Sequence, residues 1–228
     1  MTLPSQVPGS QSLSRTVPEM RARLIATLGA VVALAGLAGQ FDINLARREG
    51  DVLAALWGMT RFFTNLTVAF AAGVLLWAAL GGRVRARTGA GLVLSALVMA
   101  LVYYLVLAPA WTPEGFRWWV AQAMHGATPL AVAVWWLACV PKAGLTMRMF
   151  PGWAAFPVGY LVMSLLRQAA GERAPYPFLN LGERGAFGVA VAALAITLVY
   201  LLLAAALIAL ARRLDQSESP GSSSSERP

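Results

Sequence analysis

The chain has 228 residues, of which 58% are hydrophobic and 12% are charged, with a mean hydropathy of +0.65 and a formal net charge of +8. A surface in contact with water needs more charge than this, so the composition excludes an ordinary water-soluble domain. The Lys and Arg residues lie at the ends of apolar blocks and form no dense stripe, so we expect no nucleic-acid partner. The sequence predicts an integral membrane protein whose partners are membrane lipids.

Six apolar blocks are long enough to cross a bilayer as helices, since about 20 residues span its hydrocarbon core. They cover residues 23–44, 61–80, 90–108, 118–140, 153–170 and 186–211. The apolar segment 51–60 could extend the second block along the membrane interface. A cleaved secretory signal is the alternative for the first block, but its late start and unclear cleavage site favour a helix.

The ends of the chain differ from the six blocks. Residues 1–20 and 214–228 are rich in Ser and Pro and show no periodicity, so we expect two disordered cytoplasmic tails. Residues 21–213 are then a single six-helix transmembrane domain. The longest connection, 171–185, contains several prolines and is expected to fold as a short structured lid over the outer face. Arg167, just before it, is expected to snorkel to the outer interface.

The distribution of basic residues predicts the orientation of this domain. With six spans, the side that holds the N-terminus carries eleven Lys and Arg residues and the other side carries seven. The richer set is Arg15, Arg21, Arg23, Arg83, Arg85, Arg87, Lys142, Arg148, Arg212, Arg213 and Arg227. Because the richer side faces the cytoplasm, both termini are predicted to be cytoplasmic, in a multi-pass protein of the cell inner (plasma) membrane.

Hydroxyl side chains concentrate in the second block. Thr60, Thr64 and Thr67 are spaced at i, i+4 and i+7, which places them on one face of a continuous helix. Arg61 and Asn65 lie on the adjoining arc. Threonines in membrane helices commonly bond to a carbonyl one turn earlier, so this face is either structural or functional.

His125, the chain's single histidine, lies in the fourth block. Gln122 and Pro129 share its face, one turn away on either side. Because Pro129 has no N–H, the carbonyl of His125 loses its helical donor and the helix is expected to kink there. His125 is either a packing residue bonded to a neighbour or a base that accepts a proton near neutral pH. With Cys139 as the chain's single cysteine, the sequence predicts no metal site and no cofactor.

The second and fourth blocks both enter from the predicted outer side, so the two polar faces can meet. A Thr64 hydroxyl activated by His125 is the minimal arrangement for acyl transfer through a covalent intermediate. Asn65, Arg61 or backbone N–H groups freed by the kink are candidates to stabilise an oxyanion. Gln122 is a candidate supporting residue beside His125.

Three motifs resemble a known family. RFFTNLTVAF at 61–70, HGATPLAV at 125–132 and APYPFLNLGERG at 174–185 are similar to motifs of the bacterial Pr-six-Pr integral membrane proteins, which belong with the androgen-induced, FAR-seventeen-a type six-helix family. The resemblance covers about residues 20–211. It implies a hydrolase of fatty-acid esters that uses a Thr nucleophile, matched by Thr64, and a His partner, matched by His125. Thr67 is the match if the alignment slips by one turn, and Asn65 and Asn180 depart from the usual pattern.

Two other functions remain open at this stage. In a transporter or channel, the polar faces would line a passage, although the sequence shows no internal repeat of the kind that many transporters carry. In a scaffold or lipid-binding protein, the same polar residues would only hold helices together. Catalysis requires Thr64 and His125 to approach within hydrogen-bond reach, whereas the scaffold does not.

Overall fold

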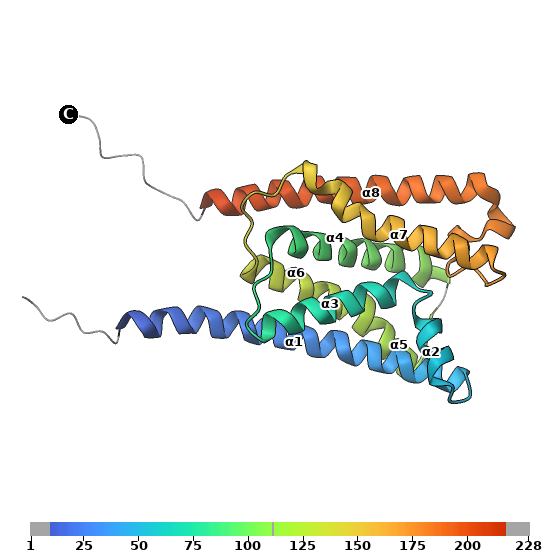
Figure 1. Ribbon diagram of the computed structural model, residues 1–228, viewed down its shortest axis with the longest axis horizontal. Helices are drawn as coiled ribbons and strands as arrows, with labels where there is room; N and C mark the ends of the chain where they lie inside the picture. The colour runs from blue at the N-terminus through green and yellow to red at the C-terminus, as the bar shows by residue number, and fades with distance from the viewer. Residues whose placement is uncertain (1–9, 111, 218–228) are drawn as a thin grey trace, which may run out of the picture.

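The computed structural model describes residues 10–110 and 112–217, and these residues are helical without any strand (Figure 1). The α-helices are α1 (Ser10–Arg47), α2 (Val52–Met59), α3 (Phe63–Ala79), α4 (Ala86–Val102), α5 (Phe116–Gln122), α6 (Thr128–Cys139), α7 (Phe150–Ala169) and α8 (Leu181–Ser217). Short 3-10 turns occupy Ala108–Ala110, Met147–Met149 and Pro177–Leu179. The prediction of an all-helical protein is confirmed.

Four helical stretches are long and apolar enough to cross a membrane. They are Glu19–Arg47, Ala86–Ala110, Met147–Ala169 and Leu181–Gln216. A fifth span results if α2 and α3 are counted together, although the two helices meet at 94°. The stretch from α5 to α6 is not among them, because Gln122, His125 and Thr128 make it more polar. The described residues therefore contain four or five clear candidate spans, not the six predicted.

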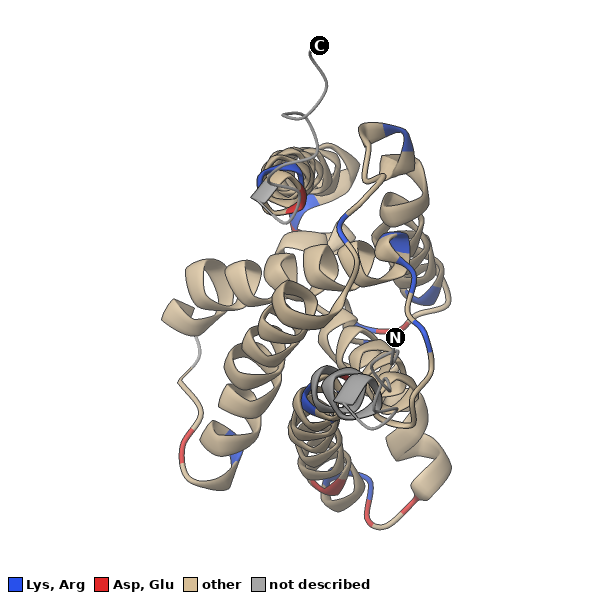
Figure 2. Cartoon of the chain, turned by 90° about the vertical axis from the view of Figure 1, so that its left-hand side faces the viewer, with Lys and Arg blue, Asp and Glu red and all other residues tan. Residues whose placement is uncertain are grey.

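The helices form an elongated bundle with α4 in its interior. Figure 1 shows α7 and α8 on one side of α4, and α6, α3 and α1 on the other. The main hydrophobic core joins α4 to α1, α3, α6, α7 and α8, with Leu92, Leu94 and Trp136 fully or almost fully buried. Helix α1 begins and α8 ends at the same end of the bundle. Figure 2 shows Lys and Arg residues on the connections at this end. Arg83 and Arg85 lie between α3 and α4, and Arg87 lies in the first turn of α4.

A sharp corner separates α2 from α3. The side-chain amide of Asn65 donates to the carbonyl of Met59 at 2.8 Å, and the Thr60 hydroxyl donates to the carbonyl of Trp57 at 2.7 Å. Both bonds satisfy carbonyls at the end of α2 that have no helical donor. The corner therefore interrupts the predicted helix 61–80 at its start and removes Thr60 from the face that carries Thr64 and Thr67.

Two π-helical turns interrupt the regular α-helices, and these two turns lie next to each other in space. The first, Tyr103–Leu107, extends α4, and the second, Ala123–Ala127, joins α5 to α6. The second lies directly before Pro129, where the missing N–H was expected to kink the helix. The Thr128 hydroxyl donates to the Ala123 carbonyl at 2.8 Å and so satisfies one of the acceptors in this turn. Such π-turns are common at functional sites.

Two glycines let α1 approach α5 and the second π-turn. A Cβ on Gly39 would lie 2.6 Å from Cγ2 of Val120, and one on Gly36 would lie 2.9 Å from Cγ of Met124. These distances are too short for a side chain, so the contact requires glycine. Small residues allow such close approach between the helices of a membrane bundle.

The ends of the helices differ from the predicted boundaries. Helix α1 starts at Ser10, so residues 10–20 are helical, because a helix that is already nucleated extends at little cost. Helix α8 starts at Leu181, before the predicted residue 186, with a break at Gly185 where φ is 63°. It also extends to Ser217, into the predicted C-terminal tail. The rest of the two predicted tails, 1–9 and 218–228, lies outside the described residues.

Candidate functional site

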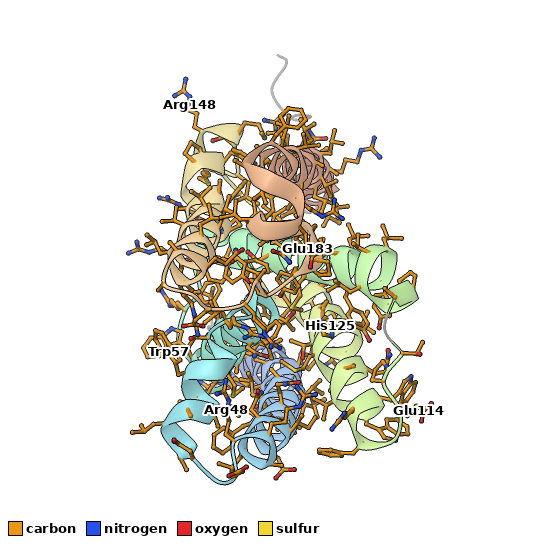
Figure 3. The ribbon with its side chains drawn as sticks, turned by 90° about the vertical axis from the view of Figure 1, so that its right-hand side faces the viewer. Arg48, Trp57, Glu114, His125, Arg148 and Glu183 are labelled. Atoms are coloured by element: carbon orange, nitrogen blue, oxygen red, sulfur yellow. The ribbon has the colours of Figure 1, made fainter. Side chains whose placement is uncertain are left out.

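Thr64 and His125 meet across the bundle. Oγ1 of Thr64, in the first turn of α3, lies 3.1 Å from Nε2 of His125, in the π-turn between α5 and α6. The Thr64 residue is 8% exposed, and His125 is half-buried. Figure 3 shows His125 among the helices, whereas Glu114 and Arg148 lie at the periphery. The 94° corner brings this contact about, because it places Thr64 at the start of α3 and directs it into the bundle.

The second nitrogen of the imidazole determines the direction of the contact. Nδ1 of His125 lies 3.0 Å from the carbonyl oxygen of Ala121, and a carbonyl can only accept. Nδ1 therefore carries the proton of the neutral ring, and Nε2 presents its lone pair. It follows that the Thr64 hydroxyl donates to Nε2, which is the orientation of a nucleophile and its base.

Tyr103 fixes the plane of the imidazole. The two rings stack with centroids 3.8 Å apart and an angle of 15° between their planes. Tyr103 is 3% exposed and begins the first π-turn, so the two irregular turns meet at this stack. The sequence analysis did not single out Tyr103. A tyrosine at the end of an apolar block resembles an ordinary interfacial anchor, and no sequence signal pairs it with His125.

An apolar cavity opens beside Thr64. It has a volume of about 130 Å³, is partly open to the outside, and lies between α3, α4, α7 and α8. Its walls are mainly aliphatic and aromatic, with Phe150 and Tyr200 at a distance from Thr64 and with Tyr176, Phe178 and Leu179 close to it in the fold. Along α7 the lining runs from Phe150 to Leu161, a helical rise of about 16 Å at 1.5 Å per residue. Thr64 lines the cavity and His125 does not, so His125 lies behind the hydroxyl.

The connection between α7 and α8 lines one end of this cavity. The ring of Tyr176 stacks on Phe178, with centroids 5.1 Å apart, and meets Phe62 edge-on at 5.9 Å. Gln168 holds the connection in place, since its amide donates to the Leu179 carbonyl and accepts from the Leu181 N–H. The Tyr176 hydroxyl interacts with the side chain of Thr64 and with the backbone of Phe63 and Thr64. Tyr176 is a residue of the site that sequence reasoning did not single out, although it lies in the quoted APYPFLNLGERG motif.

The predicted supporting residues lie elsewhere. The Asn65 amide is bonded to Met59 at the corner, and Gln122 accepts from the Tyr104 hydroxyl at 2.7 Å. Thr67 is completely buried, and its hydroxyl has no hydrogen-bond partner among the described residues. The guanidinium of Arg61 lies over the ring of Phe62, with 5.1 Å between its Cζ and the centroid. None of these four residues lines the cavity, so none is placed to contact a reacting group there.

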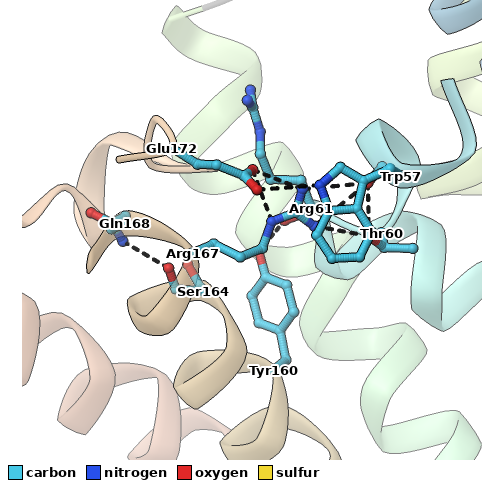
Figure 4. Close-up of polar contacts among 8 residues, drawn as sticks. All are labelled: Trp57, Thr60, Arg61, Tyr160, Ser164, Arg167, Gln168 and Glu172. Carbon is cyan, nitrogen blue, oxygen red and sulfur yellow. Dashed lines mark hydrogen bonds and ion pairs between the residues drawn. The ribbon is translucent and has the colours of Figure 1, made fainter. Parts of the chain in front are cut away.

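Arg167 is buried in a polar cluster and does not extend freely to the interface as predicted. Figure 4 shows its guanidinium between Glu172, Thr60 and Trp57. Nη2 lies 2.7 Å from Oε2 of Glu172, Nη1 donates to Oγ1 of Thr60 at 2.8 Å, and the group lies over the Trp57 ring. The Tyr160 hydroxyl adds a bond to the Arg61 carbonyl at 2.9 Å. The cluster ties α7 to the corner that positions Thr64.

No group of three or more His, Cys, Asp and Glu residues suited to a metal ion occurs within residues 10–110 and 112–217. Comparison of the chain with protein-family models, with curated proteins and with solved structures finds no match.

Proposed function

We propose that the protein is a membrane-embedded lipid hydrolase that cleaves fatty-acid esters, with Thr64 as nucleophile and His125 as base. The observation that carries the proposal is the 3.1 Å contact between Thr64 Oγ1 and His125 Nε2 at the wall of an apolar cavity. A threonine with a purely structural role needs neither a base on another helix nor an adjoining cavity. The resemblance of the three motifs to the Pr-six-Pr family supports the same assignment.

The reaction follows from the orientation of the pair. Oγ1 of Thr64 attacks the ester carbonyl carbon while its proton moves to Nε2 of His125. The tetrahedral intermediate expels the alkoxide, which takes the proton from His125 and leaves as the alcohol. A water molecule then loses a proton to His125 and attacks the acyl-threonine. The second tetrahedral intermediate expels Oγ1 of Thr64, which takes this proton back from His125, and the fatty acid is released. Nδ1 of His125 keeps its own proton throughout and donates it in a hydrogen bond to the Ala121 carbonyl.

The cavity favours a substrate with a long acyl chain. Its walls are apolar over a length of about 16 Å along α7, so the chain would lie along α7 with its ester at Thr64. Burying apolar surface contributes roughly 25 cal/mol per Å², which gives a long chain enough binding free energy without any charged contact. A lipid-binding protein without catalysis would use the same cavity and is the second candidate.

We further propose six membrane crossings with both termini cytoplasmic, in the cell inner membrane. The sixth crossing would be the continuous stretch from α5 to α6, whose polar residues are turned towards α3 and α4. Two observations support an even number of crossings, namely that α1 begins and α8 ends at one end of the bundle, and that basic connections gather there (Figures 1 and 2). The site would then open near the outer leaflet.

Covalent labelling tests the proposal. A fluorophosphonate probe is expected to label the detergent-solubilised wild-type protein, and labelling should disappear in Thr64→Val and in His125→Ala. Thr67→Val is the matched control, because it makes the same change one turn along α3 at a hydroxyl that has no partner. A parallel measurement follows fatty-acid release from p-nitrophenyl esters of increasing chain length.

The outcomes separate the candidates. Labelling and hydrolysis that require Thr64 and His125 but not Thr67 support the hydrolase. Folded protein that neither reacts with the probe nor cleaves any ester, yet binds a fluorescent fatty acid, would contradict it in favour of lipid binding. Loss of labelling in Thr67→Val alone would move the nucleophile to Thr67.

A further inference from the structure

An esterase requires a hydrogen-bond donor for the negative oxygen of its tetrahedral intermediate, and this donor was not identified among the predicted residues. The side-chain donor of Asn65 is bonded to Met59, and Arg61 does not line the cavity. The imidazole N–H of His125 is directed at Ala121, away from Thr64. The donor must therefore come from another group next to Thr64.

Tyr176 is the polar side chain in that position. Its hydroxyl interacts with the Thr64 side chain, and both residues line the cavity. Because the Thr64 hydroxyl donates to His125, the O–H of Tyr176 is left to donate to Thr64 Oγ1 in the resting protein. The nucleophile therefore already has a donor besides its base.

The backbone at the start of α3 adds to this arrangement. The first N–H groups of a helix have no acceptor within the helix, and Thr64 lies in the first turn of α3. The Tyr176 hydroxyl interacts with the backbone of both Phe63 and Thr64, so it lies directly at this helix end. A carbonyl carbon bonded to Thr64 Oγ1 would place its oxygen among the same groups.

We propose that Tyr176 is a catalytic residue that donates its O–H to the oxyanion formed on the Thr64-bound ester carbon, with the N–H of Thr64 as second donor. When Oγ1 forms its bond to the carbonyl carbon, the π electrons move to the carbonyl oxygen, which becomes the new acceptor for Tyr176. When the alkoxide leaves, the double bond re-forms and the Tyr176 proton stays on its own oxygen. The lid thus completes the site as well as covering it.

Two properties of Tyr176 suit this role. Burial raises the pKa of the Tyr176 hydroxyl, so it remains protonated and able to donate at neutral pH. Its ring is held between Phe62 and Phe178, and the connection that carries it is tied to Gln168, so the hydroxyl is positioned before the substrate arrives. A donor that is already in place stabilises developing charge without reorganisation.

The test is Tyr176→Phe, which keeps both ring contacts and removes only the hydroxyl. We expect kcat for a long-chain p-nitrophenyl ester to fall about 10²- to 10³-fold, as on removal of an oxyanion donor, with KM nearly unchanged. Tyr104→Phe is the matched control, since it also removes a tyrosine hydroxyl, which bonds to Gln122, and Tyr104 does not line the cavity. The unfolding temperature of each variant checks its folding.

A second readout addresses the oxyanion directly. A trifluoromethyl ketone of the same chain length forms a tetrahedral adduct with the nucleophile, so Tyr176→Phe should weaken its inhibition by a factor that parallels the loss in kcat. An unchanged or higher kcat in Tyr176→Phe would overturn this inference. The inference rests on the proposed function, and Thr64→Val distinguishes the two. If Thr64→Val remains active, the hydrolase mechanism itself fails, whereas an inactive Thr64→Val with an active Tyr176→Phe refutes only the role of Tyr176.

Discussion

Arg167 and Glu172, at the end of α7, are joined both by a side-chain ion pair and by a backbone hydrogen bond. Nε and Nη2 of Arg167 both contact Oε2 of Glu172, at 2.9 and 2.7 Å, while the Glu172 N–H donates to the Arg167 carbonyl at 2.9 Å. Gly171, with φ of 89°, lies between them and permits the Schellman turn that brings them together. The ion pair also holds the connection that carries Tyr176 against the corner that carries Thr64.

This pair predicts a pH dependence of stability. The Arg167 hydrogen bond lowers the pKa of the Glu172 carboxyl from its ordinary value. A carboxyl whose pKa is lower in the folded state stabilises the fold at any pH above its pKa in the unfolded state, which is about 4.3 for Glu. This contribution is lost as the pH falls through the pKa of the folded state. Glu172→Gln is therefore expected to lower the free energy of unfolding by about 1–2 kcal/mol at pH 7. The effect is no larger because the Glu172 side chain is partly exposed to solvent. The difference between variant and wild type should shrink towards pH 3.

Thermal unfolding in detergent between pH 7 and pH 3 measures this difference. Glu114→Gln serves as the control, because Glu114 is exposed and forms no ion pair among the described residues. A difference between wild type and Glu172→Gln that stays constant over the whole range would refute the contribution of the carboxylate charge.

The packing of Gly39, in α1, on Val120, in α5, leads to another prediction. Because a Cβ on Gly39 would lie 2.6 Å from the branched side chain of Val120, Gly39→Ala should destabilise the protein by about 1–3 kcal/mol. Gly73→Ala is the matched control, since a Cβ on Gly73 meets no atom within 4 Å and Ala is the better helix former. The unfolding temperatures of the two variants should therefore move in opposite directions. Equal shifts would mean that the close approach of α1 contributes nothing to stability.

The sequence predicted the all-helical class and the elements that meet at the site. The sequence indicates both Thr64 and His125 as candidate site residues, because burying a polar side chain in a membrane costs free energy and such residues are therefore few in apolar blocks. An irregular helix before Pro129 was also predicted, since the missing N–H is a local property, and it takes the form of the π-turn Ala123–Ala127. These features depend on residue type and on spacing along a single helix.

The features that could not be predicted depend on contacts between distant segments. The spacing predicted that Thr60 shares a helix face with Thr64. Hydrogen bonds made by Asn65 and by Thr60 itself form a corner between the two residues, and spacing along a single helix cannot predict this corner. Arg167 appeared to be an interfacial residue, and its burial depends on Glu172 and Trp57. The stacking of Tyr103 on His125 likewise requires two π-turns to lie side by side.

Pro129 provides a prediction that separates stability from activity. An N–H at position 129 could donate to the carbonyl of His125 and favour a regular α-helix over the π-turn Ala123–Ala127. Pro129→Ala should therefore leave the unfolding temperature unchanged or raise it, because a residue with poor helix propensity is replaced by the best helix former. The regular helix would rotate the imidazole out of the π-turn geometry that sets its 3.1 Å contact with Thr64.

We expect the rate of fluorophosphonate labelling of Pro129→Ala to fall by about tenfold or more, since small displacements of a base from its nucleophile are costly. Pro151→Ala is the control, because Pro151 lies in the first turn of α7 and does not line the cavity. If Pro129→Ala labels as fast as wild type, the π-turn is not needed to position His125. If labelling and unfolding temperature fall together, the proline acts through packing, and the assignment of the turn to catalysis is refuted.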